Sequence, residues 1–418
     1  MAQSKTKKIK RLAILVGGGP APGINGVISA ATIEAVNRGI EVIGIRDGFK
    51  WISEGNTKHI DILTIENTSR IHNTGGSIIG ISRVSPLSSA KGMKNTINCL
   101  KKLEVKYLIT IGGDGTLYLA SRLEKESKGQ IKIAQVPKTI DNNMPLPGYI
   151  STFGYETARH IGTGLVHNLM EDARTTKRWY FVVTMGRKTG HLALGIGKAS
   201  GATLTLIPEE FREKKISLKK IITILEGAII KRMSVGREDG VAILAEGITE
   251  KLDEDELNNL KDLSVDEHGR IRLSEVDLGH LLKQQTIKSL SEKGVHTRIV
   301  DKRIGYELRS APPIPFDAKY TRDLGYSAVK FLLGGGGGAL ITIQRGKKIP
   351  LFFDKLIDSK TDKTKIRFVD INTESYEVAQ KYMIKLSKED LTNREKLRKL
   401  AELTNMKPNE FKAYFSVI

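Results

Sequence analysis

Short apolar runs recur along this chain, and most of them end at a glycine-rich or charged motif. Residues 11–16 (RLAILV) lead into GGGPAPG, 105–111 (VKYLITI) into GGDGT, 131–136 (IKIAQV) into PKTIDNN, and 179–184 (WYFVVT) into MGRKTG. Helix-like stretches follow several of these motifs, for example at residues 24–38. Strands that alternate with helices indicate an α/β protein with mostly parallel sheets and helices on both faces.

The position of these motifs points to function, because ligands bind such sheets beyond the carboxyl ends of the strands. A glycine turn lets backbone N–H groups approach a phosphate, and the helix N-terminus behind it favours an anion. The turn at residues 17–23 matches neither common nucleotide-binding fingerprint, and a purely structural turn explains it about as well. The five glycines at residues 334–338 fit a helix cap followed by a tight turn.

Two of the motifs place a carboxylate just after a strand. Asp114 in GGDGT could hold Mg²⁺ while its neighbouring glycines accommodate a polyphosphate, or it could simply cap a helix. Asp141 in PKTIDNN could accept a proton from a substrate hydroxyl, with Lys138 neutralising a transferring phosphoryl group. The simpler explanation of the second motif is a polar turn.

Three further charged residues suit a phosphorylated sugar. Arg187 in MGRKTG and Arg309 in GYELR could clamp a sugar phosphate through bidentate hydrogen bonds. Glu246, which follows the apolar run VAILA, could bind sugar hydroxyls. Each of them, taken alone, is more often a surface charge than a ligand.

Composition narrows the class of protein. The 418 residues suffice for two or three domains, and 67 Lys and Arg against 47 Asp and Glu give a net charge of +20. A basic protein attracts polyanions, which include nucleic acids, membranes and phosphorylated metabolites. Because the basic residues are dispersed, no dedicated nucleic-acid or membrane partner is expected. Cys99 is the only cysteine, which excludes an intrachain disulfide and a Cys-based zinc site. Neither a membrane-spanning run nor a secretory signal is evident, so we expect a cytoplasmic protein.

Taken together and in this order, the motifs resemble those of the phosphofructokinase family, from about residue 10 to about residue 350. The longest similar runs are PKTIDNN with TFGYETARHIG, EDARTTKRWYFVVTMGRKTGHLALGIGKASGATLTLIPEEF, and LAEGI, and they are most similar to the pyrophosphate-dependent branch. The resemblance implies two Rossmann-like lobes with mostly parallel sheets. It also implies phosphorylation of fructose 6-phosphate at its 1-hydroxyl to give fructose 1,6-bisphosphate in glycolysis. NAD kinases and some lipid kinases share only GGDGT.

The resemblance also implies how the chain is divided. We expect a phosphoryl-donor-binding lobe at residues 1–150, completed by part of 310–418, and a fructose 6-phosphate-binding lobe at 151–309. A C-terminal helical tail is expected at 380–418. Family members assemble as dimers or tetramers with shared active sites, so a homodimer or homotetramer is expected here.

Residue roles carry over onto the matching positions of this sequence. Asp141 matches the catalytic base and Asp114 the Mg²⁺-binding carboxylate, while Thr139 and Lys138 flank the transferred phosphoryl group and Arg187 orients the substrate. The positions that match the donor site are Gly19, Arg83, Gly113, Gly115 and Thr116. The positions that match the fructose 6-phosphate site are Met185, Gly186, Arg187, Glu246, Tyr306 and Arg309, joined across a subunit interface by Arg178 and by Arg303 or Lys302.

Two residues give opposite indications of the phosphoryl donor. In the family, a second aspartate after GGD is typical of pyrophosphate users because it obstructs the α-phosphate of ATP, and a glycine is typical of ATP users. This chain has Gly115, which leaves room for a nucleotide, but it also has Lys138, which pyrophosphate users carry. An open space permits ATP and a lysine does not forbid it, so ATP is the expected donor and pyrophosphate the alternative.

One position departs from the family pattern. The family usually reads TIDND, whereas this chain has Asn143 in TIDNN. An amide neither attracts Mg²⁺ nor raises the basicity of Asp141 as well as a carboxylate does. Slower turnover or an altered metal dependence is therefore expected, and a catalytically impaired regulatory subunit is a further alternative.

Overall fold

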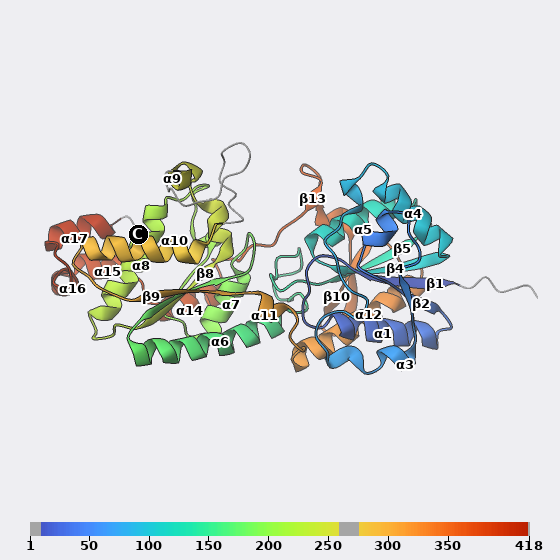
Figure 1. The fold of residues 1–418 in the computed structure, drawn as a ribbon, viewed down its shortest axis with the longest axis horizontal. Helices are drawn as coiled ribbons and strands as arrows, with labels where there is room; N and C mark the ends of the chain where they lie inside the picture. Colours follow the sequence, from blue (N-terminus) through green and yellow to red (C-terminus); the bar gives the residue numbers. More distant parts are fainter. Residues whose placement is uncertain (1–9, 259–275, 417–418) are drawn as a thin grey trace, which may run out of the picture. The chain divides into compact units, whose positions relative to one another are not determined.

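The computed structural model describes residues 10–258 and 276–416, which form two compact units. Unit 1 contains the residues up to Ala158 together with Tyr306–Arg367, and unit 2 contains Arg159–Gly305 together with the residues from Phe368 onward (Figure 1). The chain therefore passes between the units three times. Among the described residues, no helix is both long and apolar enough to cross a membrane.

Unit 1 is built on a seven-stranded sheet with the strand order β11-β10-β5-β4-β1-β2-β3. The five inner strands are parallel, and the two edge strands, β3 and β11, pair antiparallel with their neighbours. The strands are β1 (Arg11–Val16), β2 (Glu41–Ile45), β3 (Ile60–Leu63), β4 (Val105–Gly112), β5 (Lys132–Pro137), β10 (Ala339–Gln344) and β11 (Lys347–Phe352).

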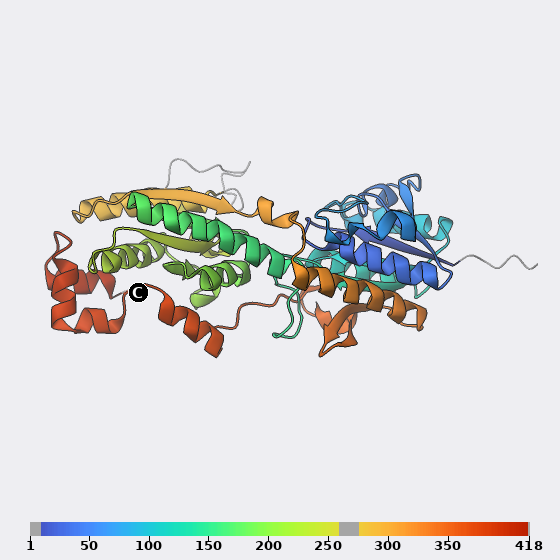
Figure 2. The same ribbon diagram turned by 90° about the horizontal axis from the view of Figure 1, so that it is seen from below.

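Helices cover both faces of this sheet, because successive residues of its inner strands are apolar and their side chains point to opposite faces. Leu12 and Ile14 pack with helices α1 (Ile24–Asn37) and α12 (Pro315–Leu333), which lie side by side in Figure 2. Ala13 packs on the other face. The helices there are α4 (Gly92–Lys102) and α5 (Asp114–Glu126).

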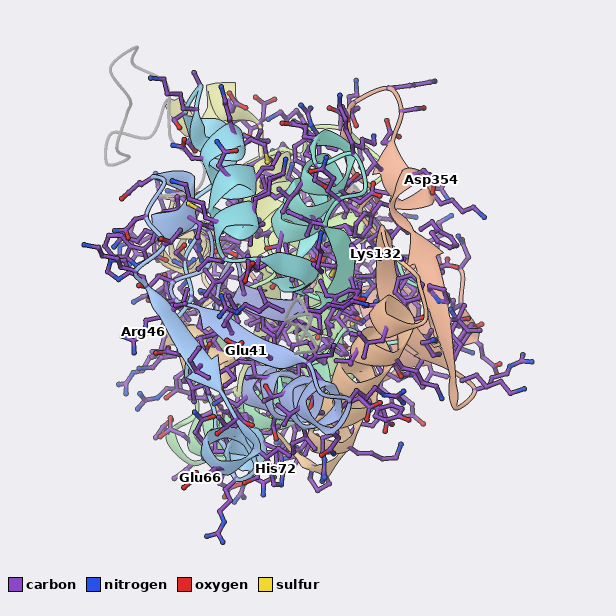
Figure 3. The ribbon with its side chains drawn as sticks, turned by 90° about the vertical axis from the view of Figure 1, so that its right-hand side faces the viewer. Glu41, Arg46, Glu66, His72, Lys132 and Asp354 are labelled. Carbon is purple, nitrogen blue, oxygen red and sulfur yellow. The ribbon has the colours of Figure 1, made fainter. Side chains whose placement is uncertain are left out.

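Short elements complete unit 1. They are α2 (Lys50–Ser53), α3 (Ile65–Thr68), α11 (Tyr306–Arg309), α13 (Phe353–Leu356), and the two-stranded ribbon of β12 (Ile357–Asp358) and β13 (Lys363–Thr364). Figure 3 views the end of the sheet at which strands begin, where Glu41 opens β2 and Lys132 opens β5. The glycine-rich motifs follow the opposite ends of the strands.

Unit 2 has a four-stranded, fully parallel sheet in the order β7-β8-β6-β9. Its strands are β6 (Trp179–Thr184), β7 (Leu204–Leu206), β8 (Gly240–Ala245) and β9 (Ile299–Ile304). Its helices are α6 (Tyr155–Thr176, which begins in unit 1), α7 (His191–Ser200), α8 (Leu218–Met233), α9 (Glu254–Asn258), α10 (Leu278–Glu292), α14 (Glu374–Tyr382), α15 (Lys388–Thr392), α16 (Arg394–Ala401) and α17 (Pro408–Phe415).

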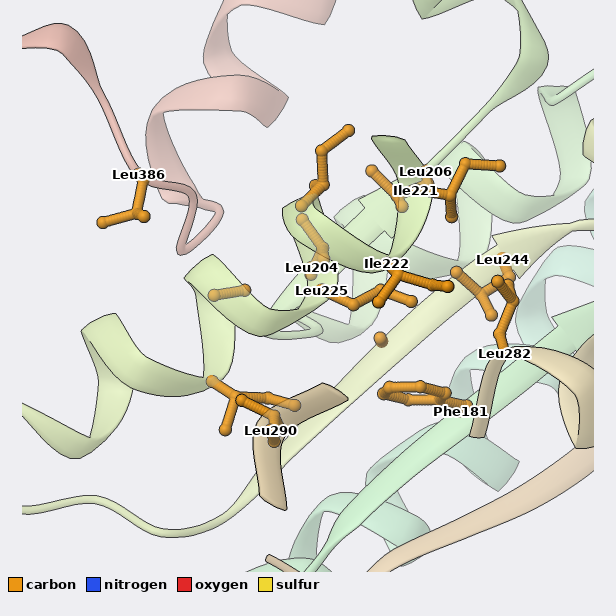
Figure 4. Packing of buried hydrophobic residues seen from close by; sticks show 14 of the residues in the cluster. Phe181, Leu204, Leu206, Ile221, Ile222, Leu225, Leu244, Leu282, Leu290 and Leu386 are labelled. Carbon is orange, nitrogen blue, oxygen red and sulfur yellow. The ribbon is translucent and has the colours of Figure 1, made fainter. Parts of the chain in front are cut away.

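The core of unit 2 is a cluster of buried aliphatic and aromatic side chains. Phe181 of β6 belongs to a buried cluster with Ile222 and Leu225 of α8 and with Leu282 and Leu290 of α10 (Figure 4). All five side chains are at most 8% exposed. The cluster attaches the two helices to the sheet, so the strand ends of unit 2 are held by a rigid support.

A buried polar contact joins the end of the chain to this core. Glu226 of α8 is fully buried, and its two carboxylate oxygens accept hydrogen bonds from Lys293 Nζ and from the Tyr414 hydroxyl, each at 3.0 Å. Tyr414 belongs to α17, and the Lys293 ammonium lies 4.2 Å from the centroid of its ring. The contact stabilises the carboxylate inside unit 2 and fixes α17 against α8.

The α/β architecture with two mostly parallel sheets confirms the predicted fold class. The runs at residues 11–16 and 179–184 form β1 and β6 with the predicted bounds, and the helix predicted at 24–38 ends one residue earlier. The glycine run at 334–338 begins at the C-cap of α12, where Gly335 and Gly338 adopt positive φ angles. Those conformations favour glycine, which agrees with the cap and turn expected there.

Candidate active site

Three of the predicted motifs meet in unit 1, because β1, β4 and β5 are neighbours in the sheet. The GGGPAPG turn follows β1, GGDGT follows β4, and the TIDNN loop follows β5. The turns after β1 and β4 are in close contact: a Cβ atom placed on Gly17 would lie 2.5 Å from Thr116 Oγ1. Only glycine therefore fits at this position without a local rearrangement.

Lys138 holds the first of these turns from inside. Its side chain is 3% exposed, and its Nζ donates a 2.9 Å hydrogen bond to the Gly17 carbonyl and a further one to the Gly19 carbonyl. A Cβ atom on Gly18 would lie 3.2 Å from the same Nζ. The glycine turn thus wraps around a buried amine, an arrangement that can present positive charge to an anion.

The electrostatics of Lys138 show which charges surround it. Burial lowers the pKa of Lys138 from 10.5 to about 7. Asp141 and Asp114 oppose this shift, whereas Arg309 and Arg83 add to it. Two carboxylates and two guanidinium groups from four separate segments therefore act on one amine, a concentration of charge typical of catalytic sites.

Asp114 is the first residue of α5, and Gly113 precedes it in an extended conformation. A carboxylate in the first turn of a helix is stabilised by the helix dipole. A Cβ atom on Gly113 would lie 3.4 Å from the Lys138 carbonyl oxygen, whereas a Cβ atom on Gly115 would meet nothing within 4 Å. The position that the family uses to select the donor is therefore open.

The TIDNN loop turns sharply around Asp141. The Asp141 N–H donates a 3.0 Å hydrogen bond to the Thr139 hydroxyl, and Asn142 adopts a left-handed conformation with φ of 53°. Asn143, which stands where the family usually has aspartate, is 4% exposed. A left-handed residue directly after the predicted base requires support from its neighbours.

Arg83, Tyr306 and Arg309 join the same region of unit 1. A Cβ atom on Gly19 would lie 3.5 Å from Arg309 Cζ and 3.6 Å from Arg83 Nη2. The Arg309 guanidinium lies 5.2 Å from the centroid of the Tyr306 ring, which is 73% exposed. The structure therefore brings Tyr306 and Arg309, predicted for the sugar phosphate, beside residues predicted for the donor.

A second group of predicted residues gathers in unit 2, at the carboxyl ends of β8, β6 and β9. Glu246 follows β8 and forms an ion pair with Arg303 of β9, and it accepts a 3.3 Å hydrogen bond from the Arg187 backbone N–H. Arg187, Glu246 and Arg303 line a cavity of about 470 Å³ together with Thr249 and Leu278. The cavity is lined by basic and acidic side chains in equal number, which can bind the phosphate and the hydroxyl groups of one ligand respectively.

Other predicted residues of unit 2 lie apart from this cavity. Arg178 directly precedes β6, so it lies at the opposite end of that strand from Arg187, and its Nε is 3.9 Å from an Asp172 oxygen. Met185 is buried, and a Cβ atom on Gly305 would lie 2.9 Å from its sulfur. In the part of the chain that the structure describes, Arg178, Met185 and Gly186 do not line the cavity, whereas Lys302 does.

Glu209 is a supporting residue that the motifs did not reveal. Its carboxylate accepts hydrogen bonds of 3.0 and 3.1 Å from the Gly190 N–H at the start of α7, directly after MGRKTG. Burial raises the pKa of Glu209, and backbone N–H donors from Gly190 and Val369 oppose that shift. The signal was present, because Glu209 also follows a strand, but IPEEF has no glycine to draw attention to it.

Comparison with known proteins places these residues in a family. A phosphofructokinase family model matches residues 11–332. The pyrophosphate–fructose 6-phosphate 1-phosphotransferase of Thermotoga maritima is 55% identical, over 96% of this chain and 97% of its own. The protein of the same name from Naegleria fowleri is 45% identical, over 99% and 96%.

Solved structures show the same fold. The crystal structure of the pyrophosphate-dependent phosphofructokinase of Marinobacter aquaeolei superposes with a TM-score of 0.66 at 16% identity, covering 94% of this chain and 91% of that one. At that identity the similarity supports the fold alone. The family model and the two relatives cover the strands and motifs described above, and we conclude that this chain belongs to the phosphofructokinase family.

Proposed function

We propose that this chain transfers a phosphoryl group from pyrophosphate to the 1-hydroxyl of fructose 6-phosphate, giving fructose 1,6-bisphosphate. The observation that carries the proposal is the glycine turn around buried Lys138, on which Asp114 and Asp141 act electrostatically. It occurs in a chain that is 55% identical to a pyrophosphate-dependent enzyme over 97% of that enzyme.

The chemistry assigned to unit 1 is in-line transfer with one proton movement. Asp141 accepts the proton of the 1-hydroxyl as the oxygen bonds to the phosphorus, and the bond from that phosphorus to the bridging oxygen of pyrophosphate breaks. Lys138, Arg83 and Arg309 balance charge on the donor. A bound polyanion raises the pKa of Lys138, so the amine is positively charged during transfer.

The residues present also fit a magnesium ion. Mg²⁺ is usually held by one or two carboxylates together with substrate phosphates and water, so it needs no dense protein cage. Among the described residues there is no cluster of three or more acidic, His or Cys ligands, and Asp114 is the carboxylate that would hold the ion. When bound, Mg²⁺ would neutralise the charge of the donor phosphates.

The sugar phosphate is assigned to charged groups of unit 2. Arg187, Glu246 and Arg303 supply two cations and one acceptor at the 470 Å³ cavity. Within a homodimer or homotetramer, Arg178 would reach the sugar phosphate bound by a neighbouring subunit. Its position at the other end of β6 suits that role.

The donor is the point on which the relatives revise our expectation. Gly115 favoured ATP, but the relatives at 55% and 45% identity carry names that specify pyrophosphate. A Cβ atom at Gly115 would meet nothing within 4 Å, which permits a nucleotide but does not by itself favour one. Lys138, by contrast, places a cation beneath the turn that receives the phosphates, so pyrophosphate is the better supported donor.

A direct test compares the two donors in one assay. We expect kcat/KM for pyrophosphate to exceed that for ATP by about a hundredfold or more, corresponding to about 2.7 kcal/mol of transition-state stabilisation. A higher kcat/KM with ATP would overturn the donor assignment. Turnover with neither donor would support the regulatory subunit suggested by Asn143 instead.

Substitution of Gly115 tests the gate separately. Gly115→Asp adds a negative side chain into open space, so we expect residual ATP turnover to fall at least about tenfold while pyrophosphate turnover stays within about threefold. Gly164→Asp is the matched control, because Gly164 is also helical and exposed with nothing within 4 Å of a Cβ atom. Equal losses in the two variants would refute a gate at Gly115.

A further inference from the structure

Residues 364–367 lie beyond the region 11–332 that the family model matches, yet they contact both carboxylate-bearing turns of unit 1. The Thr364 hydroxyl donates a 2.8 Å hydrogen bond to the backbone carbonyl of Asp114. The Arg367 backbone N–H donates a 2.9 Å hydrogen bond to the carbonyl of Asn143, two residues after Asp141. One short segment thus touches the backbone beside each predicted catalytic carboxylate.

The Arg367 side chain extends these contacts along the whole TIDNN loop. Nε and Nη2 donate to the Asn142 carbonyl at 3.1 and 2.8 Å, and Nη2 also donates to the Asn142 side-chain oxygen. Nη1 donates to three further carbonyls, those of Leu146 at 3.3 Å, Pro147 at 3.0 Å and Ile150 at 2.8 Å. All three guanidinium nitrogens are therefore used on a single stretch of backbone.

These contacts matter because the loop has no regular secondary structure to satisfy its carbonyls; within it, the Ile150 N–H donates to the Pro147 carbonyl at 2.9 Å. Residues 141–150 contain no helix or strand, while Asn143, Leu146 and Ile150 are buried. Buried carbonyl groups need partners, and a planar guanidinium presents five N–H donors in a fixed fork. Arg367 supplies donors to carbonyls eight residues apart, which a single ammonium group could not span.

Support also comes to the loop from its other side. The Thr152 hydroxyl donates a 2.7 Å hydrogen bond to the Thr139 carbonyl, and the Thr152 N–H donates a 3.0 Å bond to the Asn142 side-chain oxygen. Asp141 lies between Thr139 and Asn142, so both flanking residues are held. Of these supports, Arg367 is the one that acts on the left-handed Asn142 carbonyl itself.

We propose that Arg367, assisted by Thr364, is a positioning residue that sets the backbone of Asp141 and Asp114 for phosphoryl transfer. The proposal rests on the function proposed above. Arg367 acts through the loop, so its loss displaces the base without removing any group assigned to the substrates. A displacement of about 1 Å at a reacting group can cost on the order of a hundredfold in rate.

The first experiment measures kcat and KM of Arg367→Ala and of a matched control, Arg322→Ala, an exposed arginine on α12 of the same unit. We expect kcat of Arg367→Ala to fall between about tenfold and a hundredfold, with KM for fructose 6-phosphate within about twofold. The control should keep both constants. An unchanged kcat in Arg367→Ala would overturn the proposal.

Two further variants separate positioning from general destabilisation. Arg367→Lys keeps the charge but not the fork, so its kcat should stay low; full activity would show that charge alone suffices and would overturn the proposal. Added guanidinium ion, at concentrations well below those that denature, should partly restore kcat of Arg367→Ala and leave Arg322→Ala unchanged. Rescue of kcat at an unchanged melting temperature would separate positioning of the loop from a general loss of stability, whereas rescue that only follows a restored melting temperature would overturn the proposal.

Hydrogen exchange makes the proposal testable apart from turnover. Amides of residues 139–152 should exchange at least about tenfold faster in Arg367→Ala, while those of β8 in unit 2 should keep the wild-type rate. Unchanged hydrogen exchange in residues 139–152 would refute the proposal that Arg367 holds this loop. If the wild-type chain turned over neither donor, the proposed function and the catalytic role of Arg367 would both fail. The exchange rates would still show whether Arg367 holds the loop.

Discussion

The two units present their charged groups in different ways. In unit 1 the central cation, Lys138, is 3% exposed and donates to backbone carbonyls, and Arg367 likewise donates to backbone. In unit 2 the Arg303 side chain is 56% exposed and pairs with Glu246, which is 28% exposed. Exposed ion pairs contribute little to stability, whereas buried charges are costly to disturb. The buried charged side chains of unit 1 are therefore held rigidly. In unit 2, Arg303 and Glu246 can release one another and bind a ligand instead.

The largest effect is expected at Asp141, the proposed catalytic base in unit 1. Asp141→Asn keeps the shape of the side chain but removes the proton acceptor, so kcat should fall by about 10²–10⁴-fold. Binding of fructose 6-phosphate, measured by calorimetry, should stay within about threefold. A variant that retained a tenth of wild-type turnover would show that another group accepts the proton.

The next effect concerns Lys138 and its pH dependence. Lys138→Met should lower kcat by about 10²–10³-fold, because the transferring phosphoryl group loses a preorganised cation. Since the wild-type pKa is about 7, the donor-free lysine is neutral at higher pH, and KM for pyrophosphate should rise between pH 7 and pH 9 in the wild type only. A KM with the same pH profile in both proteins would contradict this.

The lowered pKa of Lys138 also predicts how the free energy of unfolding changes with pH. Between pH 7 and 10.5 the unfolded chain binds a proton at Lys138 that the folded chain does not, so the contribution of Lys138 to the free energy of unfolding rises with pH across this window. The melting temperature of the wild type should therefore increase relative to Lys138→Met as the pH is raised from 7 to 10. The difference between the two proteins should be constant below pH 6.

A smaller effect, on KM for fructose 6-phosphate, is expected at Glu246 in unit 2. Glu246→Gln removes the partner of Arg303 and an acceptor for sugar hydroxyls, so KM for fructose 6-phosphate should rise about tenfold with kcat within about twofold. Glu250→Gln is the control, because Glu250 lines the same cavity and has an exposed partner, Lys188, 3.8 Å away. A fall in kcat with unchanged KM would show that Glu246 acts in the transfer step, like the rigidly held groups of unit 1, and not in binding of the sugar phosphate.

The smallest effect is expected at Tyr414, where we expect a change in the free energy of unfolding and none in catalysis. Tyr414→Phe removes one hydrogen bond from the buried Glu226 carboxylate and should lower the free energy of unfolding by about 1–3 kcal/mol. Both kcat and KM should remain unchanged, because this contact lies in the core of unit 2. Tyr382→Phe, at a side chain that is 80% exposed, is the matched control and should leave the unfolding free energy unchanged.

The sequence allowed much of this architecture to be predicted, for physical reasons that also explain the gaps. Apolar runs that end at glycine or carboxylate identify strands and their functional ends, so β1, β4, β5 and β6 and their motifs were predictable. Arg367 was not, because KTKIRF has no periodicity or glycine, and its partners are backbone carbonyls that leave no trace in sequence. The sequence could not decide the donor, since Gly115 indicates only open space, whereas donor choice also depends on which groups line that space.

The empty volume beside Gly115 has one more consequence. A Cβ atom added there would meet no neighbouring atom within 4 Å, and the glycine turn already contains its lysine. Small substitutions at this position can therefore be compared without repacking of the protein interior. Any change in donor use that they cause would report on the added side chain itself.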